Sequence, residues 1–192
     1  MIQKVRLYLF IVVVLFSVGC QAKLPIETNL SEEVGDFSFT NEQGEEISRD
    51  DLKGNWWIAD FIFTNCTSVC PVLTQEMAKI QSELEKADLD VILVSFTVDP
   101  ENDTPERLKE FVASFTDNDA NWYLLTGYTQ AEIEQFANQQ FQTIVQKPAD
   151  SDQVIHGSSI YLIDQHGNII KKYHYSEEDY IKQLLEDIEK LL

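Results

Sequence analysis

The chain has 192 residues, and its 33 acidic residues against 14 basic ones give a formal net charge of −19. Two of the basic residues lie in a leader of 19 residues, so the rest of the chain carries a net charge of 12 − 33 = −21. This acidity excludes nucleic acid as a partner and disfavours anionic phospholipid headgroups. The remaining length suits one domain with a sizeable core, and we expect no second domain.

The first twenty residues have the pattern of an export signal. Two basic residues precede a continuous apolar stretch, 7–16, which is followed by small residues and Cys20. The stretch is short for a bilayer span, which needs about 20 apolar residues, and its end resembles the lipobox of bacterial lipoproteins. We therefore expect residues 1–19 to be a signal peptide and Cys20 to carry a lipid on the extracytoplasmic face of the cell membrane. Ser17 stands where that pattern usually has Leu, so an uncleaved signal anchor is the alternative.

A polar segment and a hairpin follow the leader. Residues 20–33 show no hydrophobic periodicity, and we expect them to form a tether between the anchor and a domain that spans 34–192. Two short segments, 37–39 and 45–47, are separated by turn residues that end in Gly44, which predicts a hairpin.

Strands and helices then alternate along the chain. The expected strands are 56–63, 91–98, 122–125, 159–163 and 168–173, and the expected helices begin at Pro71, Thr104, Thr129 and Ser176. After Pro71, apolar residues recur at spacings of four, three and four, which is one face of a helix. The alternation predicts an α/β fold with a mixed central sheet, helices on both faces and hairpins at both ends.

Cys66 and Cys70 are the most informative residues in this pattern. They lie four positions apart, between a predicted buried strand and Pro71, a residue suited to the first turn of a helix. Two sulfurs at this spacing lie on neighbouring faces of a helical turn and can share a metal ion or form a disulfide. The helix start favours thiolate over thiol, and thiolate is both metal ligand and nucleophile. A structural disulfide is the alternative, although such bridges usually join segments distant in sequence.

The three histidines occupy different settings. His156 precedes a predicted strand, whereas His166 lies beside a turn glycine and His174 ends a strand, where we expect both to face solvent. On its own, a histidine 86 positions after Cys70 is as consistent with a structural role as with a ligand role. The spacing alone therefore does not assign His156.

Asp99 follows the second predicted strand, at the edge of the sheet where sites collect in doubly wound folds. Its carboxylate is expected to orient a ligand residue or to modulate a bound metal ion. The alternative is structural: Asp99 begins a loop, and Asp103 with Thr104 caps the following helix.

Three blocks of the sequence resemble the Sco (SenC) family of copper proteins, which has a thioredoxin-like fold. The blocks are Thr64-Asn-Cys66-Thr-Ser-Val-Cys70-Pro71, Ser95-Phe-Thr-Val-Asp99-Pro100-Glu-Asn-Asp103-Thr-Pro105 and Val154-Ile-His156-Gly-Ser158-Ser-Ile-Tyr161-Leu-Ile-Asp164. The resemblance covers about 34–192, and its most specific feature is the C-x-x-x-C-P run combined with a distant histidine before a Tyr-Leu-Ile-Asp strand. Gly157 is a departure, because the family commonly has Ser there.

The resemblance implies a copper site formed by Cys66, Cys70 and His156. The chemistry of these residues agrees, because two soft thiolates with one imidazole suit Cu(I), and the same set can hold Cu(II). Structural zinc normally takes four protein ligands, which the cysteines and histidines of this chain do not supply in an obvious cluster. If Cys20 carries lipid, the three cysteines divide into one anchor and one functional pair.

The resemblance also implies a function. A family member of this kind is a membrane-tethered copper chaperone that helps to assemble the binuclear copper A centre in subunit II of cytochrome c oxidase. We expect such a protein to be a monomer and to meet the copper A domain of that subunit on the outer face of the membrane.

Other functions use the same cysteines. The main alternative is an enzyme, a thiol–disulfide oxidoreductase in which Cys66 and Cys70 are the catalytic pair and reduce the copper-ligand cysteines of the oxidase subunit. His156 favours the chaperone, because disulfide exchange needs a thiolate and a resolving thiol but no distant imidazole. A thiol peroxidase of the peroxiredoxin kind fits less well, since Phe63 stands where those enzymes place Thr. A redox or copper sensor built on this site is also compatible with the sequence.

Overall fold

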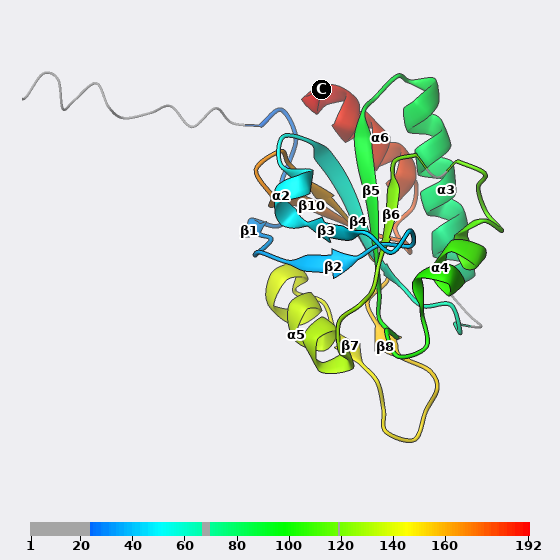
Figure 1. Ribbon diagram of the computed structural model, residues 1–192. Helices are drawn as coiled ribbons and strands as arrows, with labels where there is room; N and C mark the ends of the chain where they lie inside the picture. Colours follow the sequence, from blue (N-terminus) through cyan, green and yellow to red (C-terminus); the bar gives the residue numbers. More distant parts are fainter. Residues whose placement is uncertain (1–23, 67–69, 119) are drawn as a thin grey trace, which may run out of the picture.

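The protein is described by a computed structural model that covers residues 24–66, 70–118 and 120–192, so the expected signal peptide and Cys20 lie outside the described residues. Six strands form the central sheet: β1 (Glu32–Glu33), β4 (Trp56–Ile62), β5 (Val91–Thr97), β6 (Trp122–Leu125), β9 (Ser159–Ile163) and β10 (Asn168–His174). Their order across the sheet is β1-β10-β9-β4-β5-β6 (Figure 1). Strands β4, β5 and β6 run parallel, and β9, β10 and β1 complete the sheet in antiparallel pairs.

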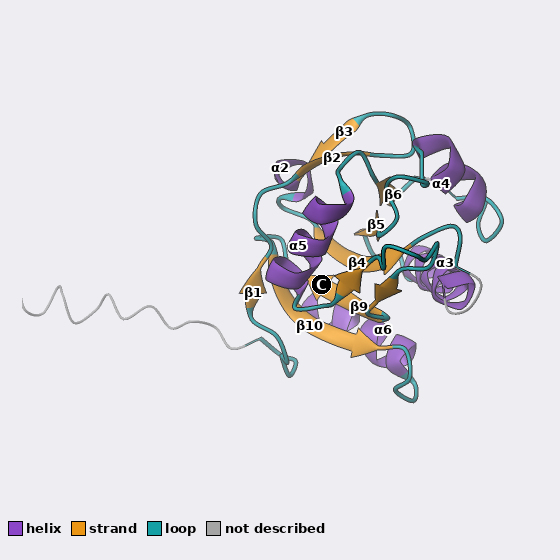
Figure 2. Ribbon diagram, turned by 90° about the horizontal axis from the view of Figure 1, so that it is seen from below, coloured by secondary structure: helices purple, strands orange, loops and turns teal. Residues whose placement is uncertain are grey.

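Helices cover both faces of this sheet. They are α2 (Arg49–Leu52), α3 (Cys70–Lys86), α4 (Pro105–Val112), α5 (Gln130–Phe141) and α6 (Tyr180–Leu191). Figure 2 shows α3 and α6 on one face, and α5 with the hairpin of β2 (Ser38–Thr40) and β3 (Glu46–Ser48) on the other. The predicted architecture, a mixed α/β sheet between helices with an N-terminal hairpin, is therefore confirmed.

Two cores fill the space between the sheet and its helices. All seven residues of β4 are buried, because both faces of this strand are covered. Trp57 and Phe61 pack in one core with Phe141 of α5. Ile58 packs in the other core with Met77 of α3, since successive strand residues point to opposite faces. The strand that leads to the two cysteines is thus packed from both sides.

The start of the last helix differs from the prediction. The prediction that Ser176 caps this helix is wrong, because α6 begins at Tyr180 and its N-cap is Asp179. The backbone N–H of Ser176 bonds to Nδ1 of His174, and that of Glu177 donates to the carbonyl of His174 at 2.9 Å. Ser176 therefore belongs to a turn after β10, and a serine before an apolar run does not by itself mark a helix cap.

The end of the segment expected to be a tether is packed against the sheet. Asn29 exchanges two hydrogen bonds of 2.8 Å with the backbone of Lys172, and β1 pairs with β10. Ile26 and Val34 are buried. The described end of this segment is therefore part of the folded domain and not a tether. In the described ranges, none of the helices is long and apolar enough to cross a membrane.

Candidate metal centre

Cys66 and Cys70 lie where β4 passes into α3. The N–H of Cys66 donates to the carbonyl of Phe63 at 3.4 Å, which closes a turn after the strand. Cys70 is the first residue of α3, and its N–H donates to Sγ of Cys66 at 3.4 Å. Both side chains are buried, and both are thiols rather than halves of a disulfide. The predicted strand–turn–helix setting of the pair is therefore present, with residues 67–69 outside the described part.

The fold brings His156 to this turn from 86 positions downstream of Cys70. Nε2 of His156 lies 3.4 Å from Sγ of Cys70. Its Nδ1 lies 2.9 Å from the carbonyl oxygen of Gly157, and because a carbonyl only accepts, Nδ1 carries the proton of the neutral ring. The lone pair of Nε2 is therefore directed at the sulfur, as in metal-binding imidazoles whose other nitrogen is held by a carbonyl. The ring of Phe63 packs edge-on against the imidazole at a centroid distance of 5.6 Å.

His156 belongs to a small hairpin outside the main sheet. Strands β7 (Val145–Gln146) and β8 (Ile155–His156) pair antiparallel, and the loop between them projects at the lower end of the molecule in Figure 1. The N–H of Gly157 donates to the carbonyl of Ile144 at 3.1 Å. We call residues 144–157 the histidine arm.

Gly157 fits its place because a larger residue would collide there. A Cβ at this position would meet Oγ1 of Thr143, a buried residue next to the arm. The space that a side chain at Gly157 would need is thus filled by Thr143. Sequence reasoning missed Thr143, since nothing near His156 in the chain points to it.

Asp99 acts on the arm and not on the ligand atoms. Its buried carboxylate lies 2.7 Å from Nζ of Lys147, directly after β7, and accepts hydrogen bonds of 2.9 and 3.0 Å from Nδ2 of Asn102. Lys147 also pairs with Glu101 at 3.0 Å. None of the contacts described for Asp99 reaches Cys70 or the imidazole. Its contacts join the loop after β5 to the strand that pairs with β8.

A second polar contact ties the arm to the cysteine turn. Nε2 of Gln153, in the loop of the arm, donates to the carbonyl of Asn65 at 3.1 Å. Asn65 directly precedes Cys66, and its Oδ1 accepts from Arg107 of α4 at 2.6 Å. The loop of the arm is thus joined directly to the residue before the first cysteine. Sequence reasoning did not single out Gln153 or Asn65, because their roles arise only from the fold.

Asp103 has a different role from the one expected. The helix cap is Thr104 alone, whose side chain accepts from the N–H of Arg107 at 3.4 Å. Asp103 turns inward and accepts from N–H and Oγ1 of Thr64 at 3.1 and 2.5 Å, and from Oγ1 of Thr97 at 2.5 Å. The expectation that Asp103 shares the capping role is wrong. Its carboxylate instead joins the start of the cysteine turn to β5.

Burial controls the acidity of the two facing side chains, Cys70 and His156. The expectation that the helix start favours a thiolate is wrong for Cys70, because burial raises the pKa of its thiol well above the ordinary range and the adjacent Cys66 raises it further. A helix dipole contributes only about 0.3–1 kcal/mol at an exposed site, less than the cost of burying an unpaired charge. Burial also lowers the pKa of His156, so the imidazole is neutral. Binding of a metal ion at Cys70 would therefore release the thiol proton.

The donor atoms suit a soft metal ion but are not fully assembled. Within the described ranges, no group of three or more His, Cys, Asp or Glu side chains is close enough to form a metal cage. Cys70 and His156 already face each other, and Sγ of Cys66 is held at the backbone of Cys70. Two sulfurs and one imidazole are a donor set for copper. Bringing all three onto one ion needs an adjustment of the arm or of the Cys66 side chain.

Comparison with known proteins agrees with this geometry. The SCO1/SenC family model matches residues 26–192. The chain belongs to the SCO1/SenC family. Among Sco relatives, a SCO1 protein homolog from Bacillus subtilis (strain 168) is 44% identical over 174 residues, which are 91% of this chain and 90% of the relative.

Solved Sco structures share the fold. A SCO1/SenC family lipoprotein from Bacillus anthracis str. Ames has a TM-score of 0.80 at 46% identity, over 83% of this chain and 95% of that one. BsSco, described by its disulfide switch and as one of the Sco family of cytochrome c oxidase assembly proteins, has a TM-score of 0.79 at 44% identity, over 86% and 96%. Arabidopsis thaliana ScoI, solved with copper bound, has a TM-score of 0.69 at 28% identity, over 81% and 98%. The predicted Sco family and thioredoxin-like fold are confirmed.

Proposed function

We propose that this protein is a membrane-tethered copper chaperone that binds copper through Cys66, Cys70 and His156. Its target is the copper A centre in subunit II of cytochrome c oxidase. The observation that carries the proposal is the approach of Nε2 of His156 to Sγ of Cys70, at 3.4 Å. Disulfide exchange alone does not need a histidine whose lone pair is directed at the sulfur. A metal site does.

The relatives support the cargo and the setting. One Sco protein was solved with copper bound, and another is described as one of a family of cytochrome c oxidase assembly proteins. A third is named a lipoprotein, which supports a lipid at Cys20 of this chain. A lipid anchor raises the effective concentration of a donor near a membrane-bound target, so a transient encounter suffices for transfer.

The surroundings of the ligands have separate roles in this proposal. Copper would replace the proton of the Cys70 thiol and bind to the two sulfurs and Nε2, as Cu(I) or Cu(II). Asp99 supports the site through its ion pair with Lys147 of the histidine arm, in which Nζ lies 2.7 Å from Oδ1 of Asp99. Because the ligands come from a fixed turn and an attached arm, release of copper can begin with the imidazole while the sulfurs keep their positions.

Copper titration tests the proposal. The reduced protein is expected to bind copper tightly, whereas the protein with a Cys66–Cys70 disulfide is expected to bind it weakly. His156→Ala should weaken binding at least about a hundredfold, since losing a residue that only supports a metal ligand already costs up to about that much, and should leave disulfide formation intact. His166→Ala, at an exposed turn position, is the matched control and should bind as the wild type does. Equal affinity in the dithiol and disulfide forms would contradict the proposal.

A thiol–disulfide oxidoreductase is the second candidate. It is favoured by the disulfide switch named for BsSco and by the 3.4 Å between Sγ of Cys66 and the backbone nitrogen of Cys70. A deletion strain separates the two functions. Loss of a chaperone should lower the activity of the copper A oxidase, spare a quinol oxidase without that centre, and respond to added copper. Equal impairment of both oxidases, with copper A fully loaded, would favour the oxidoreductase.

A further inference from the structure

Exposed apolar side chains gather at one end of the molecule. Among the described residues, five large hydrophobic side chains are 40–54% exposed. One is Leu192 at the C-terminus. The other four adjoin the metal centre, and we call them the apolar collar: Val72, Ile144, Ile155 and Tyr175.

Two collar residues flank the ligands along the chain. Val72 is two positions after Cys70, on the first turn of α3, and is 51% exposed. Ile155 directly precedes His156 on β8 and is 53% exposed. Each therefore places an exposed apolar side chain on the outer side of an element that carries a proposed ligand, because residues two apart in a helix and successive residues of a strand point in different directions.

The other two collar residues are joined to the same place by backbone hydrogen bonds. The carbonyl of Ile144 accepts from the N–H of Gly157 at 3.1 Å. The N–H of Tyr175 donates to the carbonyl of Ser158 at 3.3 Å. Gly157 and Ser158 follow His156 directly, so all four collar residues lie around one centre although they come from three parts of the chain.

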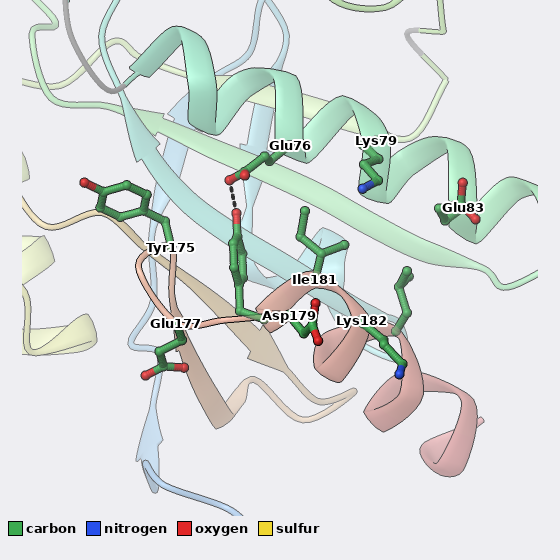
Figure 3. A pocket seen from close by; sticks show the side chains of 10 residues that line it. Glu76, Lys79, Glu83, Tyr175, Glu177, Asp179, Ile181 and Lys182 are labelled. Carbon is green, nitrogen blue, oxygen red and sulfur yellow. Dashed lines mark hydrogen bonds between the residues drawn. The ribbon is translucent and has the colours of Figure 1, made fainter.

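A cleft extends from the collar between α3 and the start of α6. It encloses about 560 Å³, and Tyr175 lines it. In Figure 3, Glu76 and Glu177 lie at the same end of the cleft as Tyr175, and Lys79 lies farther along α3. Glu76 accepts a hydrogen bond from the hydroxyl of Tyr180, which holds its carboxylate at the cleft wall. The end of the cleft nearest the collar is therefore acidic.

Helix α3 links the collar to this acidic end. Val72 and Glu76 are four positions apart, so they lie on one face of the helix. The apolar surface around the ligands thus passes directly into a pair of carboxylates.

We propose that the collar and the acidic end of the cleft dock the protein that receives the copper. This rests on the proposed function and adds the chemistry of the partner: apolar side chains around its own copper-ligand residues, and next to them a Lys or Arg. The apolar side chains cover the collar and exclude water from the transfer. The basic side chain lies between Glu76 and Glu177, against the ring of Tyr175, where a carboxylate pair and an aromatic face both attract a cation.

The charge of the molecule favours this partner over other occupants. A second copy placed symmetrically on the collar would bring Glu76 and Glu177 against acidic residues of its own kind, which is repulsive. A surface of anionic lipid headgroups is repelled in the same way. A basic protein surface is attracted by an exported part with a net charge of −21, from 12 basic and 33 acidic residues.

Copper transfer tests the docking surface. The copper-loaded chain is mixed with the copper-free copper A domain of the oxidase subunit II from the same organism, and the second-order transfer rate is measured at several salt concentrations. Val72→Ser and Tyr175→Ala should each slow transfer about tenfold, the effect of removing an interface anchor. Glu177→Gln should slow it about threefold and flatten its salt dependence, since a rim charge acts mainly on encounter. Copper affinity should be unchanged in all three variants.

The chain supplies matched controls. Leu192→Ser removes an apolar side chain of similar exposure, 53%, far from the ligands, and Glu83→Gln removes a carboxylate farther along the same cleft. Both should transfer copper at the wild-type rate. If the wild type transfers copper and Val72→Ser and Tyr175→Ala transfer it equally fast, the docking surface is overturned but the proposed function is not. No transfer by the wild type would overturn the proposed function and the docking surface with it. A concentration-dependent dimer that Val72→Ser abolishes would assign the collar to a second copy and overturn the proposal.

Discussion

The proposed metal centre joins two regions that are built in different ways. The cysteine turn continues β4, a strand buried on both faces, and its start is held by the inward carboxylate of Asp103. The histidine arm carries only two strands of two residues each outside the main sheet, and the buried side chains of Val145 and Val154 and the polar contacts of Lys147 and Gln153 connect it to the body. The sulfurs are therefore positioned by the core of the fold, whereas the imidazole is positioned by a short hairpin that adds only two buried valines to that core, together with a few polar contacts.

The cysteine turn and the histidine arm should therefore differ in how easily they change conformation. Segments with few buried apolar contacts open with a small free energy, while core strands open only with global unfolding. The turn should therefore keep its conformation with or without copper, and the arm should adjust. Under the proposed function, redox chemistry of the dithiol would need the cysteine turn alone, while copper binding would need both regions.

The largest expected effect comes from the turn. Cys66→Ser and Cys70→Ser should each lower copper affinity at least about a thousandfold, because a hydroxyl is a poor ligand for soft copper. The fold should remain, since serine is nearly isosteric with cysteine. Competition titration measures the affinity, and circular dichroism checks the fold. Near wild-type affinity in either variant would contradict a site of two thiolates.

Asp60 in β4 gives a pH-dependent test of how deeply the turn's strand is buried. Burial raises its pKa from 3.8 to about 7, Ser95 donates to its Oδ1 at 2.5 Å, and its Oδ2 has no hydrogen-bond partner in the described part of the chain. The protonated form is favoured in the folded state, so this contribution to stability is complete below pH 4 and is lost as pH rises toward 7. The loss amounts to about 4 kcal/mol.

Chemical denaturation of the copper-free protein at pH 4.5 and pH 8 measures this effect. Asp60→Asn cannot ionise at position 60 and does not lose this contribution. Its free energy of unfolding relative to that of the wild type should therefore be higher at pH 8 than at pH 4.5. Asp51→Asn, at an exposed carboxylate that caps α2, is the control, because the pKa of Asp51 is lowered and its contribution has the opposite sign. If the free energies of unfolding of Asp60→Asn and the wild type differ by the same amount at both pH values, the carboxyl of Asp60 is less buried than the structure shows.

Gly157 tests the arm. Gly157→Ala should lower copper affinity about tenfold, because its Cβ collides with Oγ1 of Thr143 and displaces the carbonyl that orients His156. Thr143→Ala in the same chain removes the collision and should restore most of the affinity. A double-mutant cycle measured by copper titration reports the coupling. Independent effects of the two substitutions would show that the contact does not position the imidazole.

The smallest effect is expected from the link between Asp99 and Lys147. Asp99→Asn should weaken copper binding about threefold to fivefold through the arm, and hydrogen exchange of residues 144–157 should become faster. Exchange in α3 should not change. Lys147→Met added to Asp99→Asn should weaken binding little further, because the two groups act as one pair. A large loss for Asp99→Asn with unaltered exchange in the arm would indicate direct contact of the carboxylate with bound copper.

Local patterns were enough to predict most of the fold. Apolar alternation and helical spacing located the strands and helices, and the turn of Cys66 and Cys70 followed from its position between β4 and α3. The start of α6 was misplaced at Ser176, because a turn and a helix cap use the same residue types. The partnership of His156 with Cys70 needed the family resemblance, since local pattern says nothing about contacts over 86 positions.

Roles that depend on tertiary contacts escaped prediction for a physical reason. In the run from Asp99 to Thr104, four side chains are of types that cap a helix, and only the packed structure decides that Thr104 caps while Asp103 turns inward. The acidity of Cys70 was misjudged in the same way. The helix start is visible in the sequence, but complete burial of the thiol is a property of the fold and outweighs it.

The pairing of β1 with β10 also affects how these molecules behave at high density. Copies attached to one membrane, as proposed, would collide often, and an open sheet edge is a template on which a second chain can add a strand. Here the outermost strand on that side is Glu32–Glu33, which offers little backbone and repels an identical acidic strand. At the opposite edge, Thr40 of the hairpin bonds to Thr126 just beyond β6. The sheet is thus protected against edge-to-edge aggregation by two glutamates and a hairpin.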